Sequence, residues 1–276
     1  FSCTITEVIR MIRATLYRRE MKGSRKLLLI FGAVITLYVS IIISMYDPEM
    51  TRLLDSYAEM MPELMAAVGM TAGAGSLLEF MSSYLYGFIL LIFPMLFSIL
   101  RGNGLICRYI EKGSMVYLTA APVKRRTIAL TQAAALVSGL VILLAYTTVL
   151  EIGCAQYYFP GELDLSKLLL LNLGLLSLQL FISGWCFLAS CLFSDGKYSI
   201  GAGAGVPVLM YVLQMLANVG GKAEKAKYFT FFTLFRPDGI LASDSQAMLG
   251  IGVLSAGAAV LYVLTILAFC RRELYL

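Results

Sequence analysis

The sequence predicts an all-α integral membrane protein with six transmembrane helices and both termini in the cytoplasm. Hydrophobic residues make up 59% of the 276-residue chain and charged residues only 14%, whereas a soluble domain carries roughly 25% charged residues. The charges are also unevenly spaced, because six long windows contain no Asp, Glu, Lys or Arg. The basic residues gather between alternate windows. The first two observations predict the spans, and the third predicts their orientation.

Six uncharged windows predict the spans of a single transmembrane domain over residues 27–276. Each holds 20 to 27 residues, and a helix needs roughly 20 apolar residues to cross about 30 Å of hydrocarbon. Lipid offers no hydrogen bonds to the backbone, so the long windows favour helices over the short alternating strands of a barrel. No small-residue cleavage site follows the first window, so we expect a retained span and not a signal peptide. The windows cover residues 27–46, 80–100, 127–150, 168–194, 198–221 and 245–270.

The distribution of Lys and Arg predicts the orientation. The segments 1–26, 101–126, 195–197 and 271–276 contain 16 of the 22 basic residues. Because basic residues accumulate on the cytoplasmic side, we expect both termini inside a multi-pass protein of the plasma membrane of a bacterium. The net charge of +5 is then a consequence of topology. It does not indicate nucleic acid as a partner.

The segment 1–26 predicts an amphipathic helix before the first span. Its apolar residues recur at helical spacing, while most of its arginines fall off that stripe. Such a helix can lie on the inner leaflet, held by its apolar face and by anionic lipids. A cytoplasmic extension of the first span is the alternative. The apolar positions are Ile5, Val8, Ile9, Ile12 and Leu16.

The connection 101–126 predicts a short cytoplasmic helix. It mixes charges with apolar residues over about 108–121, and Pro122 then favours a turn before three consecutive basic residues. On the outer side, residues 47–79 predict short amphipathic helices. The aromatic segment 222–236 predicts either an interfacial aromatic belt or a re-entrant pair of short helices.

The fifth window carries a pair of small residues, Gly201 and Gly205, at a spacing that brings both to one helix face. Such a face lets helix backbones approach closely. From composition alone, a contact between subunits and ordinary packing inside the bundle are equally good interpretations. Pro94 and Pro207 lie inside spans, where they can kink a helix.

Several kinds of chemistry are missing from the sequence. The chain has no His, which excludes His-based catalysis and His metal sites. Its six cysteines show no metal spacing, and no phosphate-binding GxxxxGK[ST] loop occurs. We therefore expect no catalytic, metal or cofactor-binding residue. The windows are free of charge, unlike the spans of ion-coupled transporters, so transport would need a motor on a partner.

The run GNGLICRYIEKGSMVYLTAAPVKRRTIALTQ resembles the second-to-third span connection of permease subunits of ABC transporters of the ABC-2 type. MPELMAAVGM resembles the family's outer segment before span two, and LFRPDGIL resembles its segment before span six. Gln132 departs from the pattern, because the family usually has Lys near this position. The residues that match the connection are Glu111, Lys112, Gly113, Pro122, Arg125 and Arg126.

The resemblance implies two six-span subunits, identical or paralogous, each with a separate ABC ATPase. The ATPase would bind ATP and Mg, and this chain would bind no cofactor. The segment 108–121 would be the coupling helix, residues 1–26 the elbow helix, and Gly201 and Gly205 part of the subunit interface. The residues expected to contact the ATPase are Arg108, Glu111, Lys112, Gly113, Met115, Tyr117 and Leu118.

The predicted function is that of a permease subunit of an ATP-driven exporter, forming half of the translocation pathway. Two alternatives stay open. One is a membrane enzyme acting on lipid or peptide, which the lack of His disfavours. The other is a non-transporting sensor or immunity component on the same scaffold.

Overall fold

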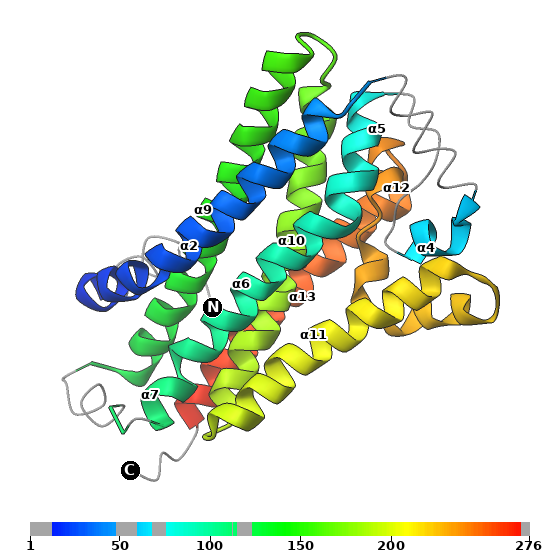
Figure 1. Ribbon diagram of the computed structural model, residues 1–276. Coiled ribbons are helices and arrows are strands. Elements are labelled where there is room, and N and C mark those ends of the chain that lie inside the picture. Colours follow the sequence, from blue (N-terminus) through cyan, green and yellow to red (C-terminus); the bar gives the residue numbers. More distant parts are fainter. Residues whose placement is uncertain (1–12, 48–59, 68–75, 112, 115–122, 272–276) are drawn as a thin grey trace.

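A computed structural model of the chain describes residues 13–47, 60–67, 76–111, 113–114 and 123–271. The regular elements in these ranges are helices, and no strand occurs in them (Figure 1). Six helical stretches are long and apolar enough to cross a membrane, which confirms the all-α class and the six candidate spans. They are α2 (Ala14–Ser44), the second stretch (Leu77–Glu111), α9 (Arg125–Tyr158), α10 (Leu165–Leu192), α11 (Gly196–Val219) and α13 (Ser245–Arg271).

The second stretch is built from four consecutive pieces. They are α5 (Leu77–Met81), the π-helical η1 (Ser82–Ile89), α6 (Leu90–Leu105) and α7 (Cys107–Glu111). Pro94 explains part of this irregularity, because it has no N–H to donate to the carbonyl of Leu90 one turn earlier. Gln179 of α10 compensates, since its Nε2 donates to the carbonyls of Leu90 at 3.4 Å and Leu91 at 2.9 Å. A side chain from another span therefore satisfies backbone acceptors that lipid could not.

Polar side chains begin several of the helices. Asp164 caps α10 by accepting from the backbone N–H groups of Ser166 and Lys167, and Asp195 caps α11 by accepting from that of Lys197. A side-chain oxygen at this position satisfies N–H groups that have no partner within the helix. The α9–α10 and α10–α11 connections are also short. They make successive spans run in opposite directions.

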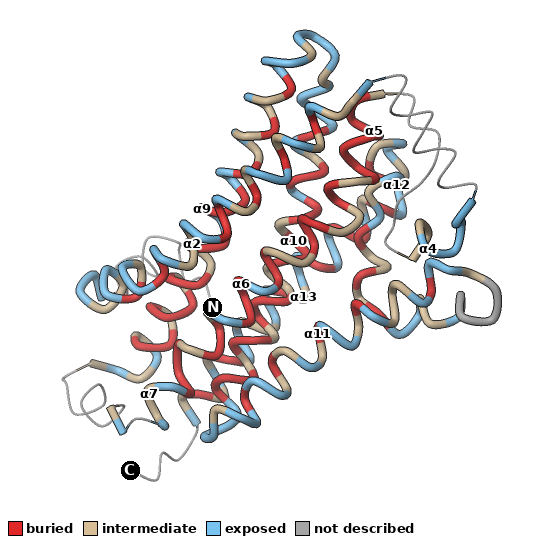
Figure 2. Tube along the Cα trace, viewed as in Figure 1, coloured by how far each residue is buried: buried red, intermediate tan, exposed pale blue. Residues whose placement is uncertain are grey.

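The α10 helix lies at the centre of the bundle. It packs against α6, α9, α11 and α13, while α2 packs mainly on α9 (Figure 1). The most apolar window of α10 is 67% buried, compared with 22% for each of α2, α11 and α13 (Figure 2). The three peripheral helices thus present most of their apolar surface outward, as spans in contact with lipid or with another subunit do.

Short helices cover the bundle at the end that holds the α9–α10 connection, which is the predicted outer end. They are α4 (Pro62–Ala67), η2 (Gly221–Phe229), η3 (Phe231–Leu234) and α12 (Pro237–Leu241). Phe232 and Phe235 are buried against the core, whereas Tyr228 and Phe229 are exposed. The predicted aromatic belt therefore applies to only part of this segment. Gly250 allows the close packing here, because a Cβ on it would lie 2.2 Å from the carbonyl oxygen of Leu234.

The helices extend beyond the uncharged windows at both ends of the bundle. From Ala14 onward, the segment 1–26 continues directly into the first span, as the alternative interpretation expected. Residues 1–12 lie outside the described residues. The third span continues past residue 150 to Tyr158, which places Glu151 inside a helix and fully buried. The expectation that no charged residue lies within a span is therefore wrong at Glu151. Helix α9 therefore continues beyond the uncharged window, which ends at residue 150, and its packing against other helices supports this extension.

Candidate functional site

The short helix α7 is fastened to the centre of the bundle at the predicted cytoplasmic end, where α10 meets α11. The chain leaves α6 at Ile106, whose φ of −120° and ψ of −57° depart from α-helical values. Two backbone N–H groups, those of Ile106 and Cys107, donate to the Ser190 hydroxyl of α10 at 3.4 Å and 3.0 Å. Because Ile106 and Cys107 are also buried, α7 begins at a fixed point on α10.

A buried carboxylate links α7 to three further helices. Glu20 of α2, only 4% exposed, accepts from Arg101 of α6 at 2.5 Å, from Tyr109 of α7 at 2.5 Å and from Gln132 of α9 at 3.3 Å. Arg101 also donates to the Glu20 carbonyl at 2.7 Å. We call Glu20, Arg101, Tyr109 and Gln132 the Glu20 cluster. Its members come from four elements, so no two of them can separate without disturbing the others.

The surroundings of Gln132 in the Glu20 cluster suit a neutral side chain better than a Lys. Glu20 already has a cationic partner in Arg101. A Lys at position 132 would bring a second buried cation to one carboxylate, and burying an uncompensated charge is costly. The neutral amide donates a hydrogen bond without that charge.

The predicted ATPase contacts fall only partly on described residues. Arg108 and Glu111 are exposed on α7, and the Glu111 carboxylate lies against the start of α11, where a Cβ on Gly196 would be 2.8 Å from its Oε2. Gly113 has a φ of +66°, which ends the helix. Of the expected helix over 108–121, the structure describes α7 up to Glu111 and a turn at residues 113–114. Outside the described residues lie Lys112, Met115, Tyr117 and Leu118.

The two glycines of the small-residue pair lie on the outward face of α11. Gly201 and Gly205 are exposed, and a Cβ on either would have no atom within 4 Å among the described residues. Gly203, between them in sequence, faces inward, where a Cβ would lie 3.1 Å from Asn103 Oδ1. Packing inside one bundle therefore uses Gly203. Gly201 and Gly205 remain available for a contact with another chain.

A second polar cluster, which the uncharged windows did not reveal, lies within the spans. The Tyr86 hydroxyl donates to Glu151 Oε2 at 2.9 Å, and Asn172 Nδ2 donates to the same oxygen at 2.9 Å and to the Tyr86 hydroxyl at 2.6 Å. All three side chains are buried. Part of this cluster could have been suspected from the sequence, because Glu151 directly follows the uncharged window 127–150. The helix continues past that window to Tyr158. The partners from two other helices could be identified only from the fold.

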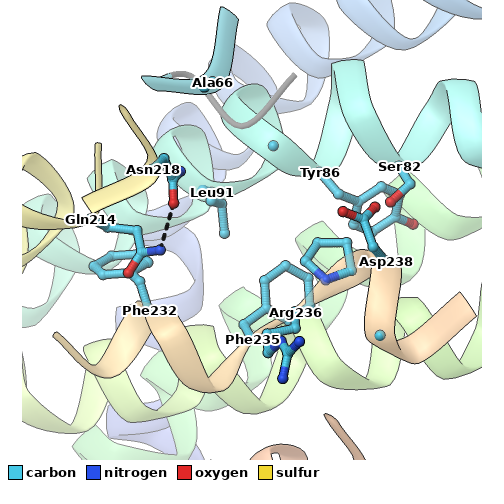
Figure 3. Close-up of a pocket in the computed structure, with 13 residues that line it drawn as sticks. Ala66, Ser82, Tyr86, Leu91, Gln214, Asn218, Phe232, Phe235, Arg236 and Asp238 are labelled. Carbon is cyan, nitrogen blue, oxygen red and sulfur yellow. Dashed lines mark hydrogen bonds between the residues drawn. The ribbon is translucent and has the colours of Figure 1, made fainter. Parts of the chain in front are cut away.

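A cavity of about 350 Å³ opens beside Tyr86 at the predicted outer end (Figure 3). Its walls come from η1, α6, α11 and the segment from η3 to α12, with Ala66 of α4 at the rim. We call this cavity the outer pocket. Burial raises the pKa of the Asp238 carboxyl at its wall, and the negative charge of Glu79 raises it further, while Arg236 acts in the opposite direction. The residues used below are Ser82, Tyr86, Phe232, Phe235, Arg236 and Asp238.

Comparisons with known proteins do not assign this chain to a family. No family model, no curated protein and no solved structure matches it.

Proposed function

We propose that this multi-pass membrane protein is the permease subunit of an ATP-driven ABC exporter of the ABC-2 type, in the plasma membrane of a bacterium. It would form half of the translocation pathway and would pair with a second permease subunit, identical or paralogous. A separate ATPase would bind ATP and Mg at its cytoplasmic end. The resemblance at residues 102–132 supports this assignment. The main structural support for the proposal is that α7 is hydrogen-bonded to Ser190 and to the Glu20 cluster, an arrangement that we call the bracing of α7.

The bracing suits a helix that receives force from a partner. One side of α7 bears the exposed charges of Arg108 and Glu111, and its other side is bonded to Ser190 and to the Glu20 cluster. A push on α7 would reach α2, α6, α9 and α10 together, because hydrogen-bonded and packed elements move as units. A permease without its own motor needs such a connection. The Glu20 cluster provides it through four elements.

The proposal predicts that Glu111, which is exposed on α7, and Tyr117 control coupling to the motor. The chain can be co-expressed with a candidate ABC ATPase, the complex purified and ATP turnover measured in lipid vesicles. The wild-type chain should co-purify with the ATPase and alter its turnover. Glu111→Gln combined with Tyr117→Ala should abolish that effect, because the side chains that would contact the ATPase are removed.

The matched control carries the same two changes at the opposite end of the bundle, Glu162→Gln with Tyr157→Ala. Both of these residues are exposed beyond or near the end of α9, so this variant should behave like the wild type. Thermal unfolding of each variant would show that the fold is retained. An ATPase that neither co-purifies with the wild-type chain nor changes its turnover would overturn the proposal.

A further inference from the structure

The outer pocket has the size and lining of a small-molecule site. Its volume of about 350 Å³ lies within the roughly 300–1,000 Å³ of ligand pockets. Aromatic side chains form much of its wall, with Phe232 and Phe235 buried against the core and Tyr86 held by Glu151 and Asn172. The aromatic part of the wall is therefore held firmly in place. Cations are attracted to such aromatic faces.

The lining of the pocket holds one carboxylate, Asp238, and one guanidinium, Arg236. The Asp238 carboxylate lies beside Ser82 and Tyr86, whereas the Arg236 guanidinium points away from them (Figure 3). Arg236 is directed to partners outside the pocket, since it lies 3.8 Å from the Asp244 carboxylate and donates to Gln246 at 3.4 Å. Glu79 adds a second negative charge close enough to act on Asp238. A cation would therefore be attracted to the side of the pocket that holds Asp238, whereas Arg236 is occupied with Asp244 and Gln246.

One polar group on the wall lacks a partner. Ser82 is 2% exposed, and its Oγ has no hydrogen-bond partner among the described residues. A buried hydroxyl without a partner is unfavourable by roughly 1–3 kcal/mol, so such groups are rare. Ser82 and Asp238 both line the pocket. A ligand ammonium in the pocket has several N–H groups and could donate to either oxygen.

The amides on the opposite wall are already satisfied by each other. Gln214 Nε2 donates to Asn218 Oδ1 at 2.9 Å, and Gln214 Oε1 accepts from the Thr233 hydroxyl at 2.8 Å. They brace α11 against η3 and form a neutral side of the cavity. Among the lining side chains, Asp238 and Ser82 offer oxygen acceptors that these amide bonds do not use.

We propose that the outer pocket binds a primary ammonium group attached to a small apolar body, with Asp238 pairing the charge, Ser82 accepting an N–H and the aromatic wall covering the apolar part. The ammonium can belong to a water-borne amine or to the ethanolamine headgroup of a lipid. The site requires neither an ATPase nor transport. A failure of this proposal would not contradict the function proposed above, and a failure of that function would not contradict this site.

Binding of radiolabelled 2-phenylethylammonium to the purified chain in nanodiscs of phosphatidylglycerol tests the site. Phenylacetate, an anion of similar size and shape, is the charge control. Saturable binding of the amine with little binding of the acid is the expected result. Equal binding of the two probes, or no saturable binding of the amine, would overturn the proposal even if no variant can be purified.

Two substitutions locate the bound charge. Asp238→Asn should weaken binding about tenfold, as expected for the loss of a hydrogen bond to a charged group. Asp244→Asn is the matched control, because it removes a carboxylate from the same segment on the side where Arg236 points. Binding by this control should stay within about twofold of the wild type. Equal losses in the two variants would contradict a role for the pocket.

The Ser82 hydroxyl is tested with a second probe. Ser82→Ala should weaken binding of 2-phenylethylammonium several-fold but leave binding of benzyltrimethylammonium unchanged, because the quaternary cation has no N–H to donate. An equal effect on both cations would contradict a hydrogen bond from the ligand. Replacing part of the phosphatidylglycerol with phosphatidylethanolamine then distinguishes the sources. Weaker apparent binding of the probe identifies the lipid headgroup as an occupant, and unchanged binding identifies a water-borne amine.

Discussion

At the scale of single residues, charged side chains inside this bundle occur where other helices supply their partners. Glu20 has a cation and two neutral donors, and Glu151 has a hydroxyl and an amide. Removing one partner of a buried ion pair leaves an uncompensated charge, whereas removing both can cost little. The pair of Glu20 and Arg101 therefore makes a specific prediction about additivity.

Glu20→Gln and Arg101→Gln should each lower the free energy of unfolding by about 3 kcal/mol, since each leaves a buried charge without its partner. The double variant should lose clearly less than the sum of the two single losses. Unfolding in mixed micelles with increasing dodecyl sulfate measures all three. Glu162→Gln, at an exposed position, is the control and should change little. Additive losses would show that the two side chains do not act as a pair.

At the scale of elements, α11 shows how one helix serves two surfaces. Its inward face carries Gly203 against Asn103 and Ala189, and its outward face carries Gly201 and Gly205 with no neighbouring atoms among the described residues. Close approach of another helix is the usual role of such a small-residue face in lipid. The helix is only 22% buried over its most apolar window. We therefore expect the outward face to be covered by a second subunit if the chain assembles as proposed above.

Gly201→Ile combined with Gly205→Ile should separate the two permease subunits, because bulky side chains prevent close contact of the helices. The stability of each subunit should be almost unchanged, since both positions face open space. Cross-linking and size-exclusion chromatography in mild detergent measure the subunit association. The control, Gly153→Ile with Gly252→Ile, alters two other outward glycines that also have no neighbour within 4 Å. Equal dissociation of this control, or an intact assembly in the test variant, would contradict the interface.

At the scale of the whole molecule, the antiparallel order of the spans separates the two candidate sites. The Glu20 cluster and α7 lie at the end where α10 meets α11, and the outer pocket lies toward the end where α9 meets α10 (Figure 1). The distribution of basic residues predicts that the first end faces the cytoplasm. A motor at one end and an organic cation at the other would then act from opposite sides of the membrane.

The predicted orientation can be measured with one cysteine at each end of α10. Glu162→Cys and Ser194→Cys introduce thiols at two exposed positions on opposite sides of the span. A membrane-impermeant maleimide should label Glu162→Cys in intact cells and Ser194→Cys only after lysis. The wild-type chain measures the background from native cysteines. The reverse pattern would invert the topology, and labelling of both from one side would contradict the span.

Much of the fold could be predicted from the sequence, because its main determinant is local. An uncharged run long enough for the bilayer must become a helix in lipid, so the six spans required no knowledge of their neighbours. The helix ends were harder to predict. Helix α9 extends past Glu151, because partners on other helices make the burial of this carboxylate tolerable. Within the described residues, α7 ends at Glu111, and Gly113 takes a left-handed conformation just beyond it.

The sequence by itself determined the six helical spans, the predicted orientation and the positions of the small-residue pair. Only the tertiary structure decided which side chains meet. Glu20 and Gln132 are 112 residues apart in the chain, yet they share a hydrogen bond, and the outer pocket combines residues from α4 to α12. Hydropathy depends on each stretch of chain alone, whereas a polar cluster depends on how separate helices pack. The packing of α2, α6, α9 and α10 is what turns dispersed polar residues into sites.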